Sequence, residues 1–297
     1  VPKNSDQLIF TTANGLYVVF NKKTGTIESL KYDDREYLYN NQGPKLSAYR
    51  APVDNDNWDG ARESWAKDGL HALEANVKEQ SVTKQKDGSI QLYFNVDYRS
   101  LRTYKDIGGA SGHNALEDVG EMPEDGLALN VKMNWTILPD GTISLMSEMS
   151  SNHPERDLAR IGFEMELDDS LTEFTYFGRG PRNNYNDRCF GSMTAVYNST
   201  VEAQFEPFPK PQDMANREDV RWCALYDKAG KGLKFEVIEN TSAPYMSVSA
   251  LSWSDMELTL APHPYQLPKP TSVHLHLDAQ VTGLGGNSCG QGGPLPK

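Results

Sequence analysis

The sequence predicts an all-β protein built from antiparallel strands. Two observations carry this prediction: large apolar residues repeatedly alternate with polar ones, and turn-forming residues separate the alternating runs. A third observation is that apolar residues at helix-like spacing are scarce. Many short strands joined by Gly- and Asp-rich turns are typical of a sandwich or a barrel.

The clearest strand covers residues 127–137. Large apolar residues occupy every second position there, so they share one face of a half-buried strand: Leu127, Leu129, Val131, Met133, Trp135 and Ile137. Shorter runs of the same kind cover residues 163–167, 233–237 and 273–281. Turn signals lie at residues 21–25, 86–88, 139–141 and 228–231.

One helix is predicted over residues 61–79, where four apolar residues recur at helix-like spacing: Trp65, Leu70, Leu73 and Val77. Residues 106–126 combine glycines with acidic residues and have little to bury. We expect them to form a long mobile loop inserted between strands, within a single domain over residues 1–297.

Charge and the two ends of the sequence restrict the functional class. With 29 Lys and Arg against 41 Asp and Glu, the formal net charge is −12, which disfavours nucleic acid or an anionic membrane as a partner. No apolar run reaches the roughly 18 residues of a membrane-spanning helix. Neither end shows a leader or a closing structural element, so we expect a fragment of a longer protein; bacterial cytoplasm and periplasm both stay open.

Four polar segments lie where strands are expected to end. In the first, short polar side chains beside Trp58 could form a sugar-binding surface, or an Asx-rich turn that satisfies only its own backbone: Arg50, Asp54, Asn55 and Asp56. The second, residues 176–188, predicts a buried network of ion pairs and hydrogen bonds that includes Arg179 and Arg188. The third covers residues 209–222. The fourth, residues 283–290, is rich in glycine, which indicates a sharp bend or a close backbone approach.

Other reactive groups give weaker signals. We expect buried free thiols, with one disulfide left open as an alternative, at Cys189, Cys223 and Cys289. His274 and His276 share one strand face, and we interpret them as residues on a solvated face rather than as metal ligands. His263 is expected to be buried and hydrogen-bonded. No carboxylate pair stands in a context that is recognisable for glycoside hydrolysis.

Five motifs occur in order over almost the whole chain: residues 15–20, 24–30, 50–56, 178–188 and 283–286. Together they resemble the C-terminal (small-chain, domain 5) region of glycoside hydrolase family 2 β-galactosidases. The resemblance implies a galactose-mutarotase-like supersandwich of antiparallel strands with few short helices. It also implies that the catalytic glutamates lie outside this chain, on a preceding (β/α)₈ barrel.

The resemblance implies a role within a larger enzyme. The parent would hydrolyse terminal β-D-galactosides with retention, and this chain would be inactive alone, supporting the barrel and helping to shape the sugar site. Its expected partners are the barrel domain or large subunit, a galactoside substrate and further copies in an oligomeric parent. No cofactor is expected in this chain, and any Mg²⁺ or Na⁺ would belong to other domains. The alternatives are a free-standing aldose 1-epimerase-like enzyme and a carbohydrate-binding module.

The resemblance also assigns residues. Those expected near the sugar site are Asn287, Ser288, Arg50, Asp54, Asn55 and Asp56. Those expected to maintain the motif structure are Gly178, Gly180, Asn184, Tyr185, Asp187, Arg188, Gln212, Asn216 and Arg217. Two departures from the family pattern stand out. A Trp that follows the Gly-rich loop in the family is missing, and Asp213, Met214 and Ala215 replace the usual Glu-Asn-Gly.

Overall fold

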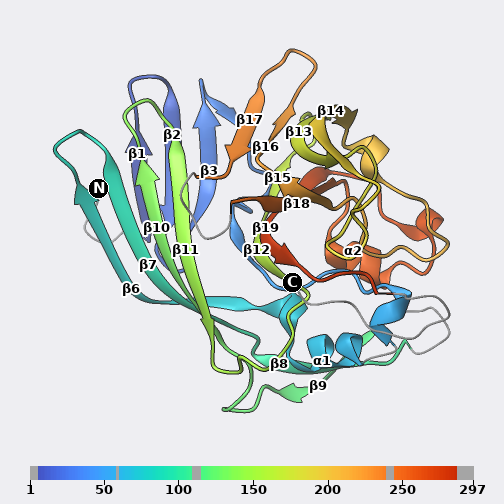
Figure 1. Cartoon of the computed structure of the whole chain (residues 1–297). Helices are drawn as coiled ribbons and strands as arrows, with labels where there is room; N and C mark the ends of the chain where they lie inside the picture. The colour runs from blue at the N-terminus through green and yellow to red at the C-terminus, as the bar shows by residue number, and fades with distance from the viewer. Residues whose placement is uncertain (1–5, 58–59, 109–114, 239–243, 286–297) are drawn as a thin grey trace.

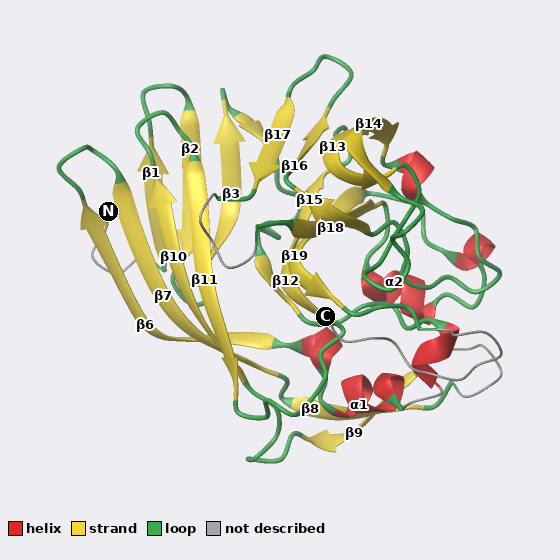
Figure 2. Cartoon of the chain, in the orientation of Figure 1, coloured by secondary structure: helices red, strands yellow, loops and turns green. Residues whose placement is uncertain are grey.

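A computed structural model describes residues 6–57, 60–108, 115–238 and 244–285. The predicted fold class is confirmed, because antiparallel sheets in a sandwich-like arrangement dominate the structure and the helices are few and short (Figure 2). Asn287, Ser288 and Cys289 lie outside the described residues. No helix in the described part of the chain is both long and apolar enough to cross a membrane.

Two four-stranded sheets occupy one side of the molecule (Figure 1). The first has the strand order β1-β2-β3-β4 and comprises β1 (Gln7–Thr11), β2 (Leu16–Asn21), β3 (Thr26–Tyr32) and β4 (Arg35–Glu36). The second has the order β11-β10-β7-β6 and comprises β6 (Glu74–Lys84), β7 (Ile90–Arg99), β10 (Leu129–Ile137) and β11 (Ile143–Ser151). The alternation predicted for residues 127–137 is confirmed, since the apolar positions of β10 are buried and the polar positions between them are more exposed.

The other half of the molecule contains two further large sheets. A five-stranded sheet has the order β15-β18-β19-β12-β5 and comprises β5 (Lys45–Ser47), β12 (Arg160–Asp168), β15 (Arg217–Val220), β18 (Met246–Leu251) and β19 (Ser272–Val281). A four-stranded sheet comprises β13 (Glu173–Gly180), β14 (Met193–Thr200), β16 (Trp222–Tyr226) and β17 (Gly232–Glu236). The predicted strands 163–167 and 273–281 thus fall in β12 and β19, and the predicted strand 233–237 lies in β17 except for its last residue.

The helices are short connections. The α-helices are α1 (Ala61–Lys67) and α2 (Asp255–Leu260). Single 3₁₀ turns cover Asp54–Asn57, Leu70–Ala72, Glu202–Gln204 and Pro264–Gln266. Lys210 donates from Nζ to the carbonyl oxygens of Leu258, Thr259 and Ala261, at 3.0, 2.9 and 2.8 Å, so a side-chain cation satisfies the open carbonyls at the end of α2.

The predicted helix over residues 61–79 is wrong beyond Lys67. Gly69 adopts φ 63°, which ends the helical segment, and residues 74–84 form β6, which pairs with β7 from Glu74↔Arg99 to Lys84↔Ile90. Backbone pairing with a neighbouring strand therefore overrides the helix-like spacing.

The predicted loop over residues 106–126 is also wrong in part. Residues 116–121 form β9 (Leu116–Glu121), which pairs with β8 (Arg102–Asp106) in a separate two-stranded sheet. Few of its side chains are buried, so no apolar pattern in the sequence predicts that this segment forms a strand.

One cluster of buried apolar residues joins the four large sheets. It includes Phe20 of β2, Phe94 of β7, Tyr176 of β13 and Leu275 of β19. The rings of Phe20 and Phe94 stack with centroids 6.4 Å apart, and Gly25 approaches Phe94 so closely that a Cβ atom there would lie 3.1 Å from its ring. This part of the core is tightly packed.

We predict that Phe94→Ala lowers the free energy of unfolding by about 3–5 kcal/mol, because removal of a fully buried ring leaves a cavity that tight packing cannot close. Urea denaturation of the chain measures this change. Phe190, which is 99% exposed, is the matched control: Phe190→Ala should change the same quantity by no more than about 0.5 kcal/mol. A similar effect of the two substitutions would contradict the proposed packing.

Candidate functional site

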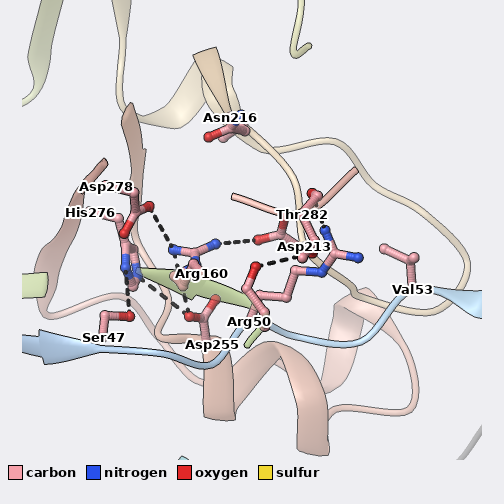
Figure 3. Close-up of polar contacts among 12 residues, drawn as sticks. Ser47, Arg50, Val53, Arg160, Asp213, Asn216, Asp255, His276, Asp278 and Thr282 are labelled. Carbon is pink, nitrogen blue, oxygen red and sulfur yellow. Dashed lines mark hydrogen bonds and ion pairs between the residues drawn. The ribbon is translucent and has the colours of Figure 1, made fainter. Parts of the chain in front are cut away.

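The four polar segments predicted from the sequence meet in one largely buried region, which we call the polar junction. Figure 3 shows the part of it around Arg50, Arg160 and Asp213. We define it by Arg50, Asp56, Arg160, Asp187 and Asp213. Its members come from the segment after β5, the start of β12, the loop after β13 and the loop before β15. Contacts among these residues and with the backbone that follows β19 hold the segments together.

Arg50 ties the first segment to the fourth. Its side chain is fully buried, and Nη2 donates to Asp56 Oδ1 at 2.8 Å. The same guanidinium donates to the carbonyl oxygens of Thr282 at 2.8 Å and Gly283 at 3.0 Å. Asp56 Oδ2 accepts from the backbone N–H of Val53 at 2.8 Å, so both charged groups are paired and hydrogen-bonded. Burial opposes the charge on Arg50, but Asp56 and Asp213 hold the Arg50 pKa above its ordinary value.

The backbone of residues 283–285 is held from two sides. Asn55 Nδ2 donates to Leu284 O at 2.8 Å, while Asp187 accepts from the N–H groups of Leu284 at 3.1 Å and Gly285 at 2.8 Å. A Cβ atom at Gly283 would collide with the Asp187 carboxylate, so glycine allows this close approach. These contacts fix the backbone up to Gly285, two positions before Asn287, the first residue of this segment predicted to face a sugar.

The second and third segments are joined by paired amides. Asn184 N donates to Asn216 O at 2.8 Å, and Asn216 Nδ2 donates to Asn184 O at 2.9 Å. Tyr185 donates from its hydroxyl to Asp213 Oδ2 at 2.7 Å, and Arg217 donates to the hydroxyl of Tyr176 at 2.9 Å. The predicted network of polar contacts is therefore present, although its ion pairs differ from those expected.

Arg160 is a second buried cation at the polar junction. Its Nη2 donates to Asp213 Oδ1 at 2.8 Å, while Nη1 lies 3.8 Å from Asp255 Oδ2 and 3.6 Å from Asp278 Oδ2. Burial opposes the charge on Arg160, but the three carboxylates keep its pKa above the ordinary value. Burial raises the pKa of Asp255 to about 7 and that of Asp278 to about 8, against the opposing influence of Arg160.

The residues predicted near the sugar site have different environments. Arg50 and Asp56 are fully buried and occupied by each other and by backbone, whereas Asp54 is exposed and Asn55 is half-buried. Trp58 lies outside the described residues. Because neither Arg50 nor Asp56 has free hydrogen-bonding atoms facing solvent, both act on the surrounding backbone. Their proximity to a sugar stays a prediction.

The residues predicted to maintain the motif structure differ in their burial and in their contacts. Gly178 and Gly180 permit close packing, since a Cβ atom would lie 2.6 Å from Val220 Cγ2 at the first and would collide with Tyr176 at the second. Arg188 is exposed, so the prediction that it joins a buried network is wrong. Gln212 is half-buried and donates to Lys210 O at 3.3 Å. Arg179 pairs with Asp219 instead of with a residue of its own segment.

Reasoning from the sequence missed Arg160, Asp255 and Asp278. The interpretation of the His274 face as solvated is wrong, because His276 is 4% and Asp278 1% exposed. Asp255, the first residue of α2, lies over this face, so strand β19 is covered on both sides. The only signal in the sequence was the placement of three titratable residues at alternate positions of one strand.

The cysteines and His263 lie outside the polar junction, and their predictions differ in outcome. Cys189 and Cys223 are free, as expected, but of these two only Cys223 is buried. His263 is exposed rather than buried, with Nδ1 3.2 Å from Pro209 O, because its loop lies at the surface. Among the described residues, one group has ligand atoms close enough to hold a metal ion, and it consists of Glu164, Asp255 and His276.

Comparison with known proteins identifies related chains. A family model described as "Beta galactosidase small chain" matches residues 12–297. The β-galactosidase of Lactobacillus delbrueckii subsp. bulgaricus is 28% identical over 297 residues, which cover 97% of this chain and 25% of that protein. The β-galactosidase of Priestia megaterium is 24% identical over 287 residues, covering 97% of this chain and 24% of the relative. This chain therefore spans about a quarter of the length of these relatives.

We predict that Asp187→Asn releases the backbone at residues 284 and 285, because the amide keeps one acceptor oxygen where the carboxylate offers two. Hydrogen exchange of the Leu284 and Gly285 amides should accelerate, and the free energy of unfolding should fall by about 1–3 kcal/mol. Asp227 is the control, since the N–H groups of Ala229 and Lys231 both donate to its Oδ1. An amide keeps this one acceptor, so Asp227→Asn should leave the protection of those two amides unchanged. Unchanged protection at both amides in Asp187→Asn would contradict this anchoring role.

Proposed function

Because the chain belongs to the β-galactosidase small-chain family, we propose that it is the C-terminal, domain 5 region of a glycoside hydrolase family 2 β-galactosidase. In this proposal the parent enzyme hydrolyses terminal β-D-galactosides with retention. The chain forms one domain of the supersandwich type, packs against the catalytic barrel or large subunit, and helps to shape the sugar site. The parent is an oligomer in this proposal.

One observation carries the proposed role in the sugar site. Asn55 and Asp187 hold the backbone at Leu284 and Gly285, while Arg50 holds the two carbonyls before them. Asn287 and Ser288 follow in the sequence after one further residue, Gly286. A site that contacts a substrate needs a rigid support, because a displacement of about 1 Å can reduce a reaction rate about a hundredfold. The polar junction provides such a support for the segment that leads to these residues.

The arrangement of carboxylates supports a non-catalytic role for the isolated chain. Retaining glycosidases place two carboxyl groups about 5–5.5 Å apart on either side of the scissile bond. Asp213, Asp255 and Asp278 instead surround the buried guanidinium of Arg160, where a sugar ring has no space between them. In our proposal the catalytic glutamates therefore come from another part of the enzyme.

The epimerase alternative requires an acid and a base that both face one open pocket. His276 lies 3.5 Å from Asp255 and 3.6 Å from Glu164, so a histidine and two carboxylates are close together, but its side chain is only 5% exposed. Burial lowers the pKa of His276 well below its ordinary value, with Arg160 acting in the same direction, so the imidazole is neutral and a poor proton donor. These observations favour the role within a β-galactosidase.

We predict that the purified chain alone does not hydrolyse o-nitrophenyl β-D-galactoside, because the catalytic carboxylates lie outside it. A spectrophotometric assay measures release of the nitrophenol. Polarimetry of freshly dissolved galactose tests epimerisation in the same sample, and calorimetric titration with galactose tests carbohydrate binding. Robust hydrolysis would overturn the proposal, rapid mutarotation would favour the epimerase, and saturable binding by the chain alone would favour the carbohydrate-binding module.

We further predict that Asp187→Asn, introduced into the full-length enzyme that carries this chain, lowers kcat/KM for the same galactoside about tenfold, equivalent to roughly 1.4 kcal/mol. The cause is misplacement of the segment after Gly285. Asp227→Asn should leave kcat/KM unchanged, since its loop is anchored far along the sequence from this segment. Equal activity of the two variants would show that the anchored segment does not support the sugar site.

A further inference from the structure

A histidine and two carboxylates from three separate elements meet beside the polar junction. Glu164 lies on β12, His276 on β19, and Asp255 is the first residue of α2. One oxygen of each carboxylate and one imidazole nitrogen all lie within 4.8 Å of one another. This arrangement plays no part in the proposed support of the sugar site.

The distances within this group match those between ligands of one metal ion. His276 Nε2 lies 3.5 Å from Asp255 Oδ2 and 3.6 Å from Glu164 Oε2, which is long for hydrogen bonds. Ligands about 2.0–2.1 Å from a tetrahedral zinc ion lie roughly 3.3 Å from each other. The three atoms therefore need to move little to bind one ion.

The surroundings of the group resemble the outer shell of a metal site. His276 Nδ1 lies 3.4 Å from Ser47 Oγ, so the nitrogen opposite the proposed ligand atom has a hydroxyl that can fix the ring orientation (Figure 3). Access is available on one side, since the Glu164 side chain is 28% exposed whereas those of Asp255 and His276 are 11% and 5% exposed.

A buried carboxylate that pairs with Arg160 but accepts no hydrogen bond from the described residues points into the same region. Asp278 is 1% exposed, and in the described part of the chain neither of its oxygens has a hydrogen-bond partner. It lies two residues after His276 on β19, and Figure 3 shows its carboxylate directed toward Arg160 beside the imidazole. A water bound to an ion at this site would supply a donor for this buried acceptor.

The ionisable groups around the proposed site have an excess of negative charge, which favours binding of a divalent cation. Four carboxylates lie in this region, those of Glu164, Asp213, Asp255 and Asp278, and two cations face them. Arg160 contacts three of the carboxylates, and Lys45 lies 3.1 Å from Glu164. When all six groups are ionised, the charge is −2, which one divalent ion neutralises. Lys45 is 46% exposed and can turn to solvent when an ion takes its place at Glu164.

We propose that Glu164, Asp255 and His276 form a binding site for a divalent transition metal, with Zn²⁺ the best match to one imidazole and two carboxylates. Water completes the coordination, and Ser47 and Asp278 form its outer shell. The ion joins α2 to the five-stranded sheet through β12 and β19. This site departs from the expectation that the chain holds no metal, and it does not depend on the proposed function.

The test uses the full chain after EDTA treatment and dialysis, titrated calorimetrically with ZnCl₂. We expect one equivalent to bind and the melting temperature to rise with the Zn²⁺ concentration. Glu164→Gln and Asp255→Asn should each weaken binding at least tenfold, and Ser47→Ala should weaken it about tenfold through the histidine orientation. MgCl₂ should not produce the same effect, because Mg²⁺ prefers six oxygen ligands.

Glu155 provides the matched control. His153 Nδ1 and Glu155 Oε1 form a surface pair 3.0 Å apart, but among the described residues no third ligand atom completes a metal site with them. Glu155→Gln should keep wild-type affinity for Zn²⁺. Absence of binding by the wild-type chain, or unchanged affinity in folded Glu164→Gln and Asp255→Asn, would overturn the proposal. If these variants do not fold, the visible spectrum of wild-type chain loaded with Co²⁺ decides: intense tetrahedral bands support the site, and a weak octahedral spectrum refutes it.

Discussion

The compensation of one buried positive charge organises this molecule. Arg50 has lost its hydration completely, so the structure must provide it with both a counter-charge and acceptors. Asp56 supplies the charge from the same segment, whereas the carbonyl acceptors come from Thr282 and Gly283 at the end of the last described strand. Loss of one partner of such a pair typically costs about 3–5 kcal/mol, because the other charge stays buried and unpaired. The polar contacts of Arg50 therefore help to fix the position of the segment after β19, together with the hydrogen bonds of Thr282 to Ala159 O.

The predictable part of the fold is the part in which one sheet face is apolar and the other is polar. Strand β10 met this condition and could be located from residues 127–137 alone. Strand β19 was also located from its apolar alternation, but the burial of its other face was not predicted, because the face that carries His276 and Asp278 is covered by α2 and the residues around Arg160. Strand β6 was mistaken for part of a helix, since its pairing with β7 depends on residues distant in the sequence. Polar residues that become buried through a second layer alternate along the strand as solvated residues do, so the period alone does not reveal their burial.

The sequence was sufficient to predict which segments form the candidate site. It was less informative about which side chains contact each other there. The local density of Asn, Asp, Arg and Gly located the segments around Arg50 and Asp187, but it could not show that Arg179 pairs with Asp219 or that Arg188 is exposed. Ala215 is a departure from the family pattern that can be explained by its backbone conformation. It adopts φ 68°, a conformation that favours the glycine usual in the family, so this chain retains the backbone geometry without the residue best suited to it.

The contact between Arg50 and the carbonyl of Gly283 also bears on synthesis of the chain, because the two residues are 233 positions apart. A ribosome that adds about 5–20 residues per second needs roughly 10–50 seconds to progress from one to the other. During that interval the first polar segment has emerged while its carbonyl acceptors do not yet exist. Arg50 must stay hydrated until then, so the polar junction can close only near the end of translation of this region.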